Sequence, residues 1–188
     1  KINTILNGGN ISTECVRNPL DWIYYGTDLT LIKDIRKKFS TNKMETYPWS
    51  SIFYHKIYLK YFKKIKVLRP LNLMPYNKKM AIDILSKEYD WTPYPQKHFE
   101  SRFTKFYEGY WMPTRFGYDT RKVQFSSLIL TQQMTRDEAI KELENLPYDK
   151  ETISEDIQFI ANKLDISVEQ LMKYHSMEKK WWFIAQRL

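Results

Sequence analysis

The spacing of hydrophobic residues changes once along the chain. Two short apolar runs, at residues 2–7 and 65–73, are rich in Ile, Val and Leu and are interrupted by Gly8 and Pro70. Such runs predict two β-strands. From Asn77 onward there is no strong strand signal, and apolar residues recur at helical spacing. The pattern therefore predicts an α/β part over residues 1–76 and a mainly helical part over residues 77–188.

Polar residues mark the expected starts of helices, because a side-chain oxygen at the N-cap accepts from an otherwise unpaired backbone N–H. An aromatic helix is expected at 51–62, and the helix that Asn77 caps should reach about Lys87. Three starts carry a capping box, in which an acid or amide three residues later completes the pairing. The expected caps are Ser12 or Thr13, Asp28 and Asn77, with capping boxes at Thr135/Glu138, Thr152/Glu155 and Ser167/Gln170.

The charge balance favours anionic partners. Thirty Lys and Arg against 22 Asp and Glu give a net charge of +8, which suits nucleotides, sugar acids, nucleic acid or an acidic membrane surface. The single cysteine, Cys15, excludes an intramolecular disulfide framework and a multi-cysteine metal site and fits a reducing cytoplasm. We also expect no metal site from three scattered histidines, and no membrane-spanning helix without an apolar run of about 20 residues.

Two stretches of the first part are candidates for ligand binding. "TILNGGNISTE" indicates a strand, a glycine turn at Gly8 and Gly9, and then a helix whose amides would face the turn. Arg69 stands at the carboxyl end of the other expected strand, where open α/β sheets bind ligands. An ordinary turn and a surface charge would give the same local pattern.

The stretch "PYPQKHFESRFTKFYEGYW" holds the densest set of polar groups on an aromatic scaffold. We expect a helix from about Lys97, with Lys97, Glu100, Thr104 and Glu108 on one face. Its polar residues could bind an anionic substrate and move a proton. A solvated amphipathic helix face would look much the same. The candidates for substrate binding or proton transfer are Lys97, His98, Glu100 and Arg102, with Lys105 and Arg115 as secondary anion contacts.

Residues 160–175 have the pattern of a helix-turn-helix, a motif that can bind DNA. The second helix would present Glu169 and Gln170 before any lysine, and an acidic residue there opposes the phosphates. Two antiparallel helices with a short turn give the same pattern and are common, so nucleic acid is the less favoured partner. The expected packing positions are Ala161, Leu164, Ile166 and Leu171.

Taken together and in this order, four stretches resemble the N-acetyl sugar amidotransferase family of lipopolysaccharide and surface-glycan biosynthesis. They are "LNGGNISTE", "RPL", "PYPQKHFESRFTKFYEGYWMPTRFGYDTRK" and "SSLILTQQMTRDEAIKEL". That family is similar to the PP-loop ATP pyrophosphatases, whose fold is shared with asparagine synthetase and the tRNA lysidine synthetases. The resemblance implies an α/β fold: the C-terminal part of an adenine nucleotide alpha hydrolase-like sheet at residues 1–76, then a helical substrate and assembly region at 77–188.

The resemblance also implies a reaction. ATP with Mg²⁺ would activate an amide or carboxylate oxygen of an N-acetylated sugar as an adenylate, and ammonia from a separate glutaminase would then attack to give an amidine or amide. The substrate would be an anionic sugar or sugar nucleotide. On this basis the residues near the nucleotide are Asn7, Gly8, Gly9, Asn10, Glu14 and Arg69.

The family's Ser-Gly-Gly-x-Asp-Ser phosphate loop occurs nowhere in these residues. We therefore expect this chain to be the carboxyl-terminal portion of a cytoplasmic amidotransferase, with the loop encoded upstream of Lys1, and to be inactive alone. The alternative is a non-catalytic helical interaction module that binds a partner enzyme or nucleic acid. The sugar, the glutaminase and a homo-oligomeric state stay open.

Overall fold

The computed structural model describes residues 2–20, 28–40, 44–148 and 150–178. The chain forms two compact units. Unit 1 comprises residues 1–10 and 19–75, and unit 2 comprises residues 11–18 and 76–188. This is a division by packing, whereas the functional division at residues 76 and 77 stays a prediction.

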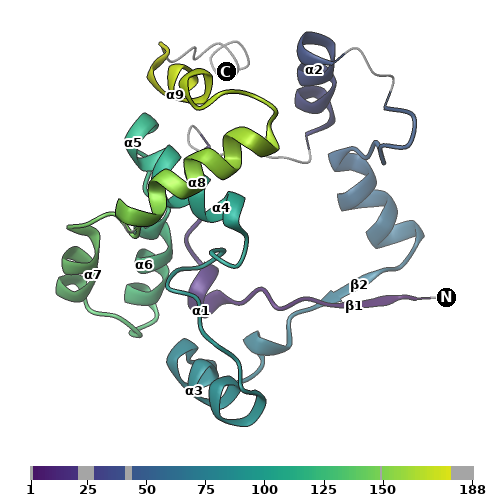
Figure 1. The fold of residues 1–188 in the computed structure, drawn as a ribbon. Coiled ribbons are helices and arrows are strands. Elements are labelled where there is room, and N and C mark those ends of the chain that lie inside the picture. Colours follow the sequence, from purple (N-terminus) through teal and green to yellow (C-terminus); the bar gives the residue numbers. More distant parts are fainter. Residues whose placement is uncertain (1, 21–27, 41–43, 149, 179–188) are drawn as a thin grey trace. The chain divides into compact units, whose positions relative to one another are not determined.

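Unit 1 contains a two-stranded parallel sheet, β1 (Thr4–Leu6) and β2 (Lys66–Leu68) (Figure 1). Ile5 lies opposite Val67 in this sheet. The expected small sheet is confirmed, and the helices of this unit are α2 (Leu29–Phe39), the π-helical η1 (Tyr54–Phe62) and the 3₁₀ turn η2 (Pro70–Asn72). The six strand residues are all exposed.

Unit 2 is built from helices alone within the residues that the structure describes (Figure 1). Within it α1 packs on α6, α6 on α7, α4 on α8, and α8 on α9. The expectation that helices dominate after Asn77 is confirmed. The elements are α1 (Ile11–Glu14), α3 (Lys78–Tyr89), α4 (Arg102–Phe106), η3 (Tyr107–Trp111), α5 (Met112–Phe116), α6 (Arg121–Leu130), α7 (Arg136–Leu143), α8 (Lys150–Lys163) and α9 (Val168–Ser176).

The core of unit 2 lies where α4 meets α8 and α9. Phe106 of α4, Ile160 and Ala161 of α8, and Leu171 of α9 are buried against one another. Buried Arg121 adds a polar contact between helices of unit 2. It donates to both carboxylate oxygens of Asp119 and to the Glu142 carbonyl. It thereby ties the start of α6 to α7.

Most helix starts follow their expected caps. The side chains of Asp28 and Asn77 accept from backbone N–H groups in the first turns of α2 and α3, and Thr135 makes the complete capping box with Glu138. Ser167 caps α9, but the side chain of Gln170 bonds Tyr174 instead of closing the box.

Two expected starts are wrong by a few residues. Helix α1 begins at Ile11, so Ser12 and Thr13 lie inside it, and α8 begins at Lys150, so Thr152 does too. A cap signal locates a helix start only to within a few residues when neighbouring residues can also adopt helical angles.

The helix expected from Lys97 begins later, at Arg102. Ser101 is its N-cap and accepts from the Thr104 N–H at 3.3 Å, whereas residues 97–100 form a turn. The expected polar face therefore does not exist as one helix face. The reason is a competing cap: the Ser101 hydroxyl accepts from the Thr104 N–H in the first turn, so the helix can begin after Ser101 and the preceding residues can form a turn.

Residues 160–175 form the end of α8, a turn and α9. Ala161 and Leu171 are buried and Ile166 packs against them, as expected. Leu164 is 52% exposed, so its assignment to the packing face is wrong. It lies in the turn that follows α8, where helical spacing no longer determines which side chain faces inward.

Candidate active site

The carboxyl ends of β1 and β2 bring two of the sequence candidates to one edge of the sheet. The backbone N–H of Asn7, just after β1, donates to the Leu68 carbonyl at 2.9 Å, and Arg69 follows directly. Gly8 and Arg69 thus lie at the same edge, as expected for parallel strands. Both are exposed, and an added Cβ at Gly8 would meet no atom within 4 Å among the described residues.

The glycine turn is closed by its own asparagines. Asn7 Oδ1 accepts from the Gly9 N–H at 2.7 Å, and Asn10 Nδ2 donates to the Gly8 carbonyl at 3.5 Å. Such a side-chain turn fixes the backbone without a ligand. The helix that follows, α1, is a single turn, so the expected helix dipole at this point is small.

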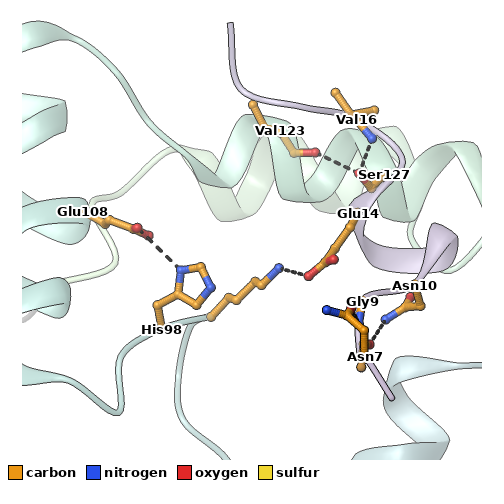
Figure 2. Close-up of polar contacts among 11 residues, drawn as sticks. Asn7, Gly9, Asn10, Glu14, Val16, His98, Glu108, Val123 and Ser127 are labelled. Atoms are coloured by element: carbon orange, nitrogen blue, oxygen red, sulfur yellow. Dashed lines mark hydrogen bonds and ion pairs between the residues drawn. The ribbon is translucent and has the colours of Figure 1, made fainter. Parts of the chain in front are cut away.

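Glu14 is held by the packing of residues 11–18 on α6 in unit 2. The Val16 N–H donates to Ser127 Oγ at 3.0 Å, and Thr131 Oγ1 donates to the Ser12 carbonyl at 2.8 Å. Figure 2 shows the first of these bonds, close to Glu14. Glu14 is therefore presented by a fixed segment.

Lys97 meets this carboxylate. Its Nζ donates to Glu14 Oε1 at 2.6 Å, across 83 positions of sequence, and both side chains stay partly exposed. Partial burial and the charge of Lys97 lower the pKa of nearby Lys78. The structure thus brings together one residue expected near the nucleotide and one expected at the substrate, next to a second ammonium group.

His98 pairs with an acid from η3. Its Nδ1 lies 3.5 Å from Glu108 Oε1. Figure 2 shows the two side chains pointing toward each other. The His98 side chain is 48% exposed, whereas that of Glu108 is 16% exposed. The ring therefore has one edge on a largely buried carboxylate and can present the other to a ligand. Burial and the charge of Glu108 also raise the pKa of Tyr107.

Arg102 and Lys105 converge on Asp156, which is buried in α8. Arg102 Nε and the Tyr148 hydroxyl both donate to this carboxylate, and Lys105 Nζ lies 3.4 Å away. Burial alone would raise the pKa of Asp156, but the bonds from Tyr148 and Arg102 and the two cationic charges outweigh it and lower the pKa. This geometry is that of a cluster that ties α4 to α8.

Arg115 is engaged at the end of α9. Its guanidinium donates to the His175 carbonyl, and His175 Nε2 lies 2.9 Å from Thr114 Oγ1. The His175 ring stacks on Tyr110 with centroids 5.7 Å apart. Burial and the charge of Arg115 lower the pKa of His175. Arg115 therefore fixes a helix end in this structure.

The candidates of residues 97–115 thus separate into different settings. Lys97 and His98 lie in an exposed turn with acidic partners, Arg102 and Arg115 hold helices together, and Glu100 is exposed in the same turn. Glu108 is the functional candidate that sequence reasoning passed over, although it was expected on the polar side of the stretch. The sequence pattern indicates this role only weakly, because its partner His98 lies ten positions away and in a turn.

One segment of the chain is similar to a known protein family. Residues 100–184 match the family described as "LPS biosynthesis protein WbpG-like, C-terminal domain". Residues 100–184 are therefore similar to the C-terminal domain of WbpG-like lipopolysaccharide biosynthesis proteins, which supports the resemblance for this portion of the chain. No curated protein and no solved structure matches the chain. None of the helices among the described residues is long and apolar enough to cross a bilayer.

Proposed function

We propose that this chain is the carboxyl-terminal portion of an ATP-dependent amidotransferase that acts on an N-acetylated sugar during lipopolysaccharide or surface-glycan biosynthesis. An amide or carboxylate oxygen of the sugar is activated as an adenylate, and pyrophosphate is released. Ammonia then displaces AMP to give an amidine or amide. ATP and Mg²⁺ are the cofactors, and a separate glutaminase supplies the ammonia.

The WbpG-like domain at residues 100–184 is the observation that carries the proposal. It supports a role in lipopolysaccharide biosynthesis, and two groups of residues in the chain suit the proposed chemistry. In unit 1, an exposed turn and Arg69 share the carboxyl edge of a parallel sheet, where α/β folds bind nucleotides. In unit 2, Lys97, Lys78 and His98 offer cationic and proton-transferring groups for an anionic sugar nucleotide.

Each group has a role in this proposal. Arg69 contacts the nucleotide phosphates from the sheet edge, since guanidinium binds phosphate oxygens in a bidentate way. Lys97 binds the anionic sugar, with Glu14 setting the direction of its ammonium group at 2.6 Å. Glu100, exposed in the same turn, is available to a sugar hydroxyl or amide.

The test is isotope incorporation by the gene product that contains these residues, together with any coding sequence upstream of Lys1. With ATP, Mg²⁺, ¹⁵N-ammonia and an N-acetylated sugar nucleotide, we expect a ¹⁵N-labelled sugar and one AMP per product. Lys97→Met should lower kcat by about 10²-fold, the scale for removing a positioned charge. Lys141→Met, which removes a lysine from the exposed side of α7, is the matched control and should leave kcat unchanged.

The chain of 188 residues alone should hydrolyse ATP no faster than buffer, because the residues that would cradle pyrophosphate are not among them. Magnesium-dependent pyrophosphate release by these 188 residues would contradict the expectation that this chain is inactive alone. No labelled sugar from the complete gene product with any N-acetylated sugar nucleotide would instead favour the interaction module.

A further inference from the structure

His98 has a backbone conformation that few side chains adopt. Its φ is 69°, in the left-handed region. A residue with a Cβ is strained there and stays only where its surroundings hold it. Such residues are frequent at binding and catalytic sites, where the strain aims a side chain. Contacts with neighbouring residues must therefore hold this turn and determine the direction of the His98 imidazole.

Phe99 and Gly109 hold the turn. A Cβ at Gly109 would lie 2.9 Å from Phe99 Cζ and 2.9 Å from Tyr148 Cδ2, which real Cβ atoms do not tolerate. Gly109 is buried, so the Phe99 ring fills the place that a side chain would take. This close approach brings the neighbouring residue, His98, against η3.

The partner that meets His98 comes from a π-helical turn. η3 covers Tyr107–Trp111 and contains both Glu108 and Gly109. π-Helical turns are rare, occur often at functional sites, and change the direction of a side chain relative to a regular helix. Here the turn directs Glu108 Oε1 to within 3.5 Å of His98 Nδ1.

The second oxygen of this carboxylate has no partner. Glu108 Oε2 is fully buried and accepts no hydrogen bond from any described residue. An unsatisfied, largely buried carboxylate oxygen is destabilising. A salt bridge built only for stability would be expected to satisfy both oxygens, as Asp156 does with Tyr148, Arg102 and Lys105.

We propose that Glu108 is a positioning residue that holds neutral His98 with its proton on Nδ1 and leaves Nε2 free as the proton acceptor in sugar amidation. This rests on the proposed function. As ammonia attacks, a C–N bond forms at the activated carbon and the C–O bond to AMP breaks. AMP leaves with the electron pair of that bond, and one proton of the attacking nitrogen passes to Nε2 of His98.

His175 provides an internal contrast. Thr114 Oγ1 donates its one proton to the Tyr110 carbonyl at 2.6 Å, so at His175 it accepts from an Nε2–H. His175 therefore carries its proton on Nε2, whereas the proposal places the proton of His98 on Nδ1. The two tautomers give different ¹⁵N patterns in one spectrum, which makes the proposal measurable without any substrate.

The experiment is ¹⁵N-histidine NMR of the chain at a pH where both rings are neutral, with His98 assigned through His98→Asn, which tolerates the left-handed backbone. The proposal expects Nδ1–H at His98 in the wild type. Glu108→Leu should shift His98 to Nε2–H, the form that an unpaired imidazole favours. Glu108→Gln should retain Nδ1–H, because its amide oxygen can still accept. Glu155→Leu, at an exposed position of α8, is the control and should change nothing.

An Nε2–H form at His98 in the wild type overturns the proposal, and this outcome needs no variant to fold. So does an unchanged Nδ1–H in folded Glu108→Leu. In the amidation assay, Glu108→Leu should lower kcat by about 10²-fold with an unchanged KM for the sugar, and Glu108→Gln should lower it less. If the wild type forms no labelled sugar, the proposed function fails, whatever the tautomer; a wrong tautomer with normal amidation refutes this inference alone.

Discussion

The two units of the chain differ in what they bury. All the buried hydrophobic residues among the described parts of the chain lie in unit 2, in α4 to α9 and the segment before α8. In unit 1 the strands β1 and β2 are exposed throughout, and the helix α2 contains no buried residue. Among the described residues, unit 2 thus carries a core, whereas the hydrophobic residues of unit 1 are exposed or half-buried.

This difference assigns the units different physical roles. A buried core stabilises unit 2. It can therefore hold His98 in a strained backbone conformation and Glu108 with one carboxylate oxygen that accepts no hydrogen bond. The stability of unit 1 depends more on its backbone hydrogen bonds and helix caps. A ligand or partner that binds only the folded unit stabilises it by RT ln(1 + L/Kd), where L is the free concentration of the ligand.

The largest expected effect is that of a core substitution against its exposed counterpart. Ile160→Ala in α8 removes a side chain that is 2% exposed and should lower the free energy of unfolding by about 2–5 kcal/mol. Ile35→Ala in α2 is the same change in a helix at 44% exposure, and should cost less than about 1 kcal/mol, because Ala favours helices. Urea denaturation followed by circular dichroism measures both. Equal losses of unfolding free energy would show that Ile35 and Ile160 contribute equally to stability, and would contradict the difference in burial between the two units.

The second effect concerns Asp156 and acid. Because its pKa is lowered in the folded chain, the cluster stabilises above the unfolded pKa near 3.9, and this contribution is lost as pH falls through and below that value. Asp156→Asn should cost about 2–3 kcal/mol at neutral pH, since charged hydrogen bonds are lost. The variant should also show a flatter stability profile in acid. A parallel loss of stability with falling pH in both proteins would exclude Asp156 as its source.

The predictable features are those that adjacent residues determine. The caps at Asp28, Asn77, Thr135 and Ser167 are predictable because a cap depends on a hydroxyl, carboxylate or amide oxygen and a backbone donor two or three positions away. The two parallel strands were also recognised, from short β-rich runs that end at Gly8 and Pro70.

The unpredictable features are set by distant contacts. Spacing alone extended the helix back to Lys97, whereas the contact of Phe99 with Gly109 and the cap at Ser101 make a turn there. The pair Lys97–Glu14 joins residues 83 positions apart, so no local pattern contains it. The roles of Arg102 and Arg115 likewise depend on partners in α8 and α9.

The smallest expected effect compares a cap in each unit. Thr135→Ala removes a complete capping box from α7 and should lower the unfolding free energy of unit 2 by about 1 kcal/mol, whereas Thr135→Gly should cost only a few tenths. Asp28→Ala removes the cap of α2 and should reduce the helical circular dichroism signal while leaving the main unfolding transition in place. A shift of that transition by Asp28→Ala as large as the shift by Thr135→Ala would mean that the two units unfold together.

The most direct test of the proposed function is sugar-dependent exchange of labelled pyrophosphate into ATP, measured without ammonia on the complete gene product. Adenylate formation is reversible before ammonia attacks, so we predict exchange that requires both Mg²⁺ and an N-acetylated sugar nucleotide and that falls in Arg69→Ala. Exchange that is absent with every such sugar, in a folded protein that binds ATP, would contradict activation as an adenylate.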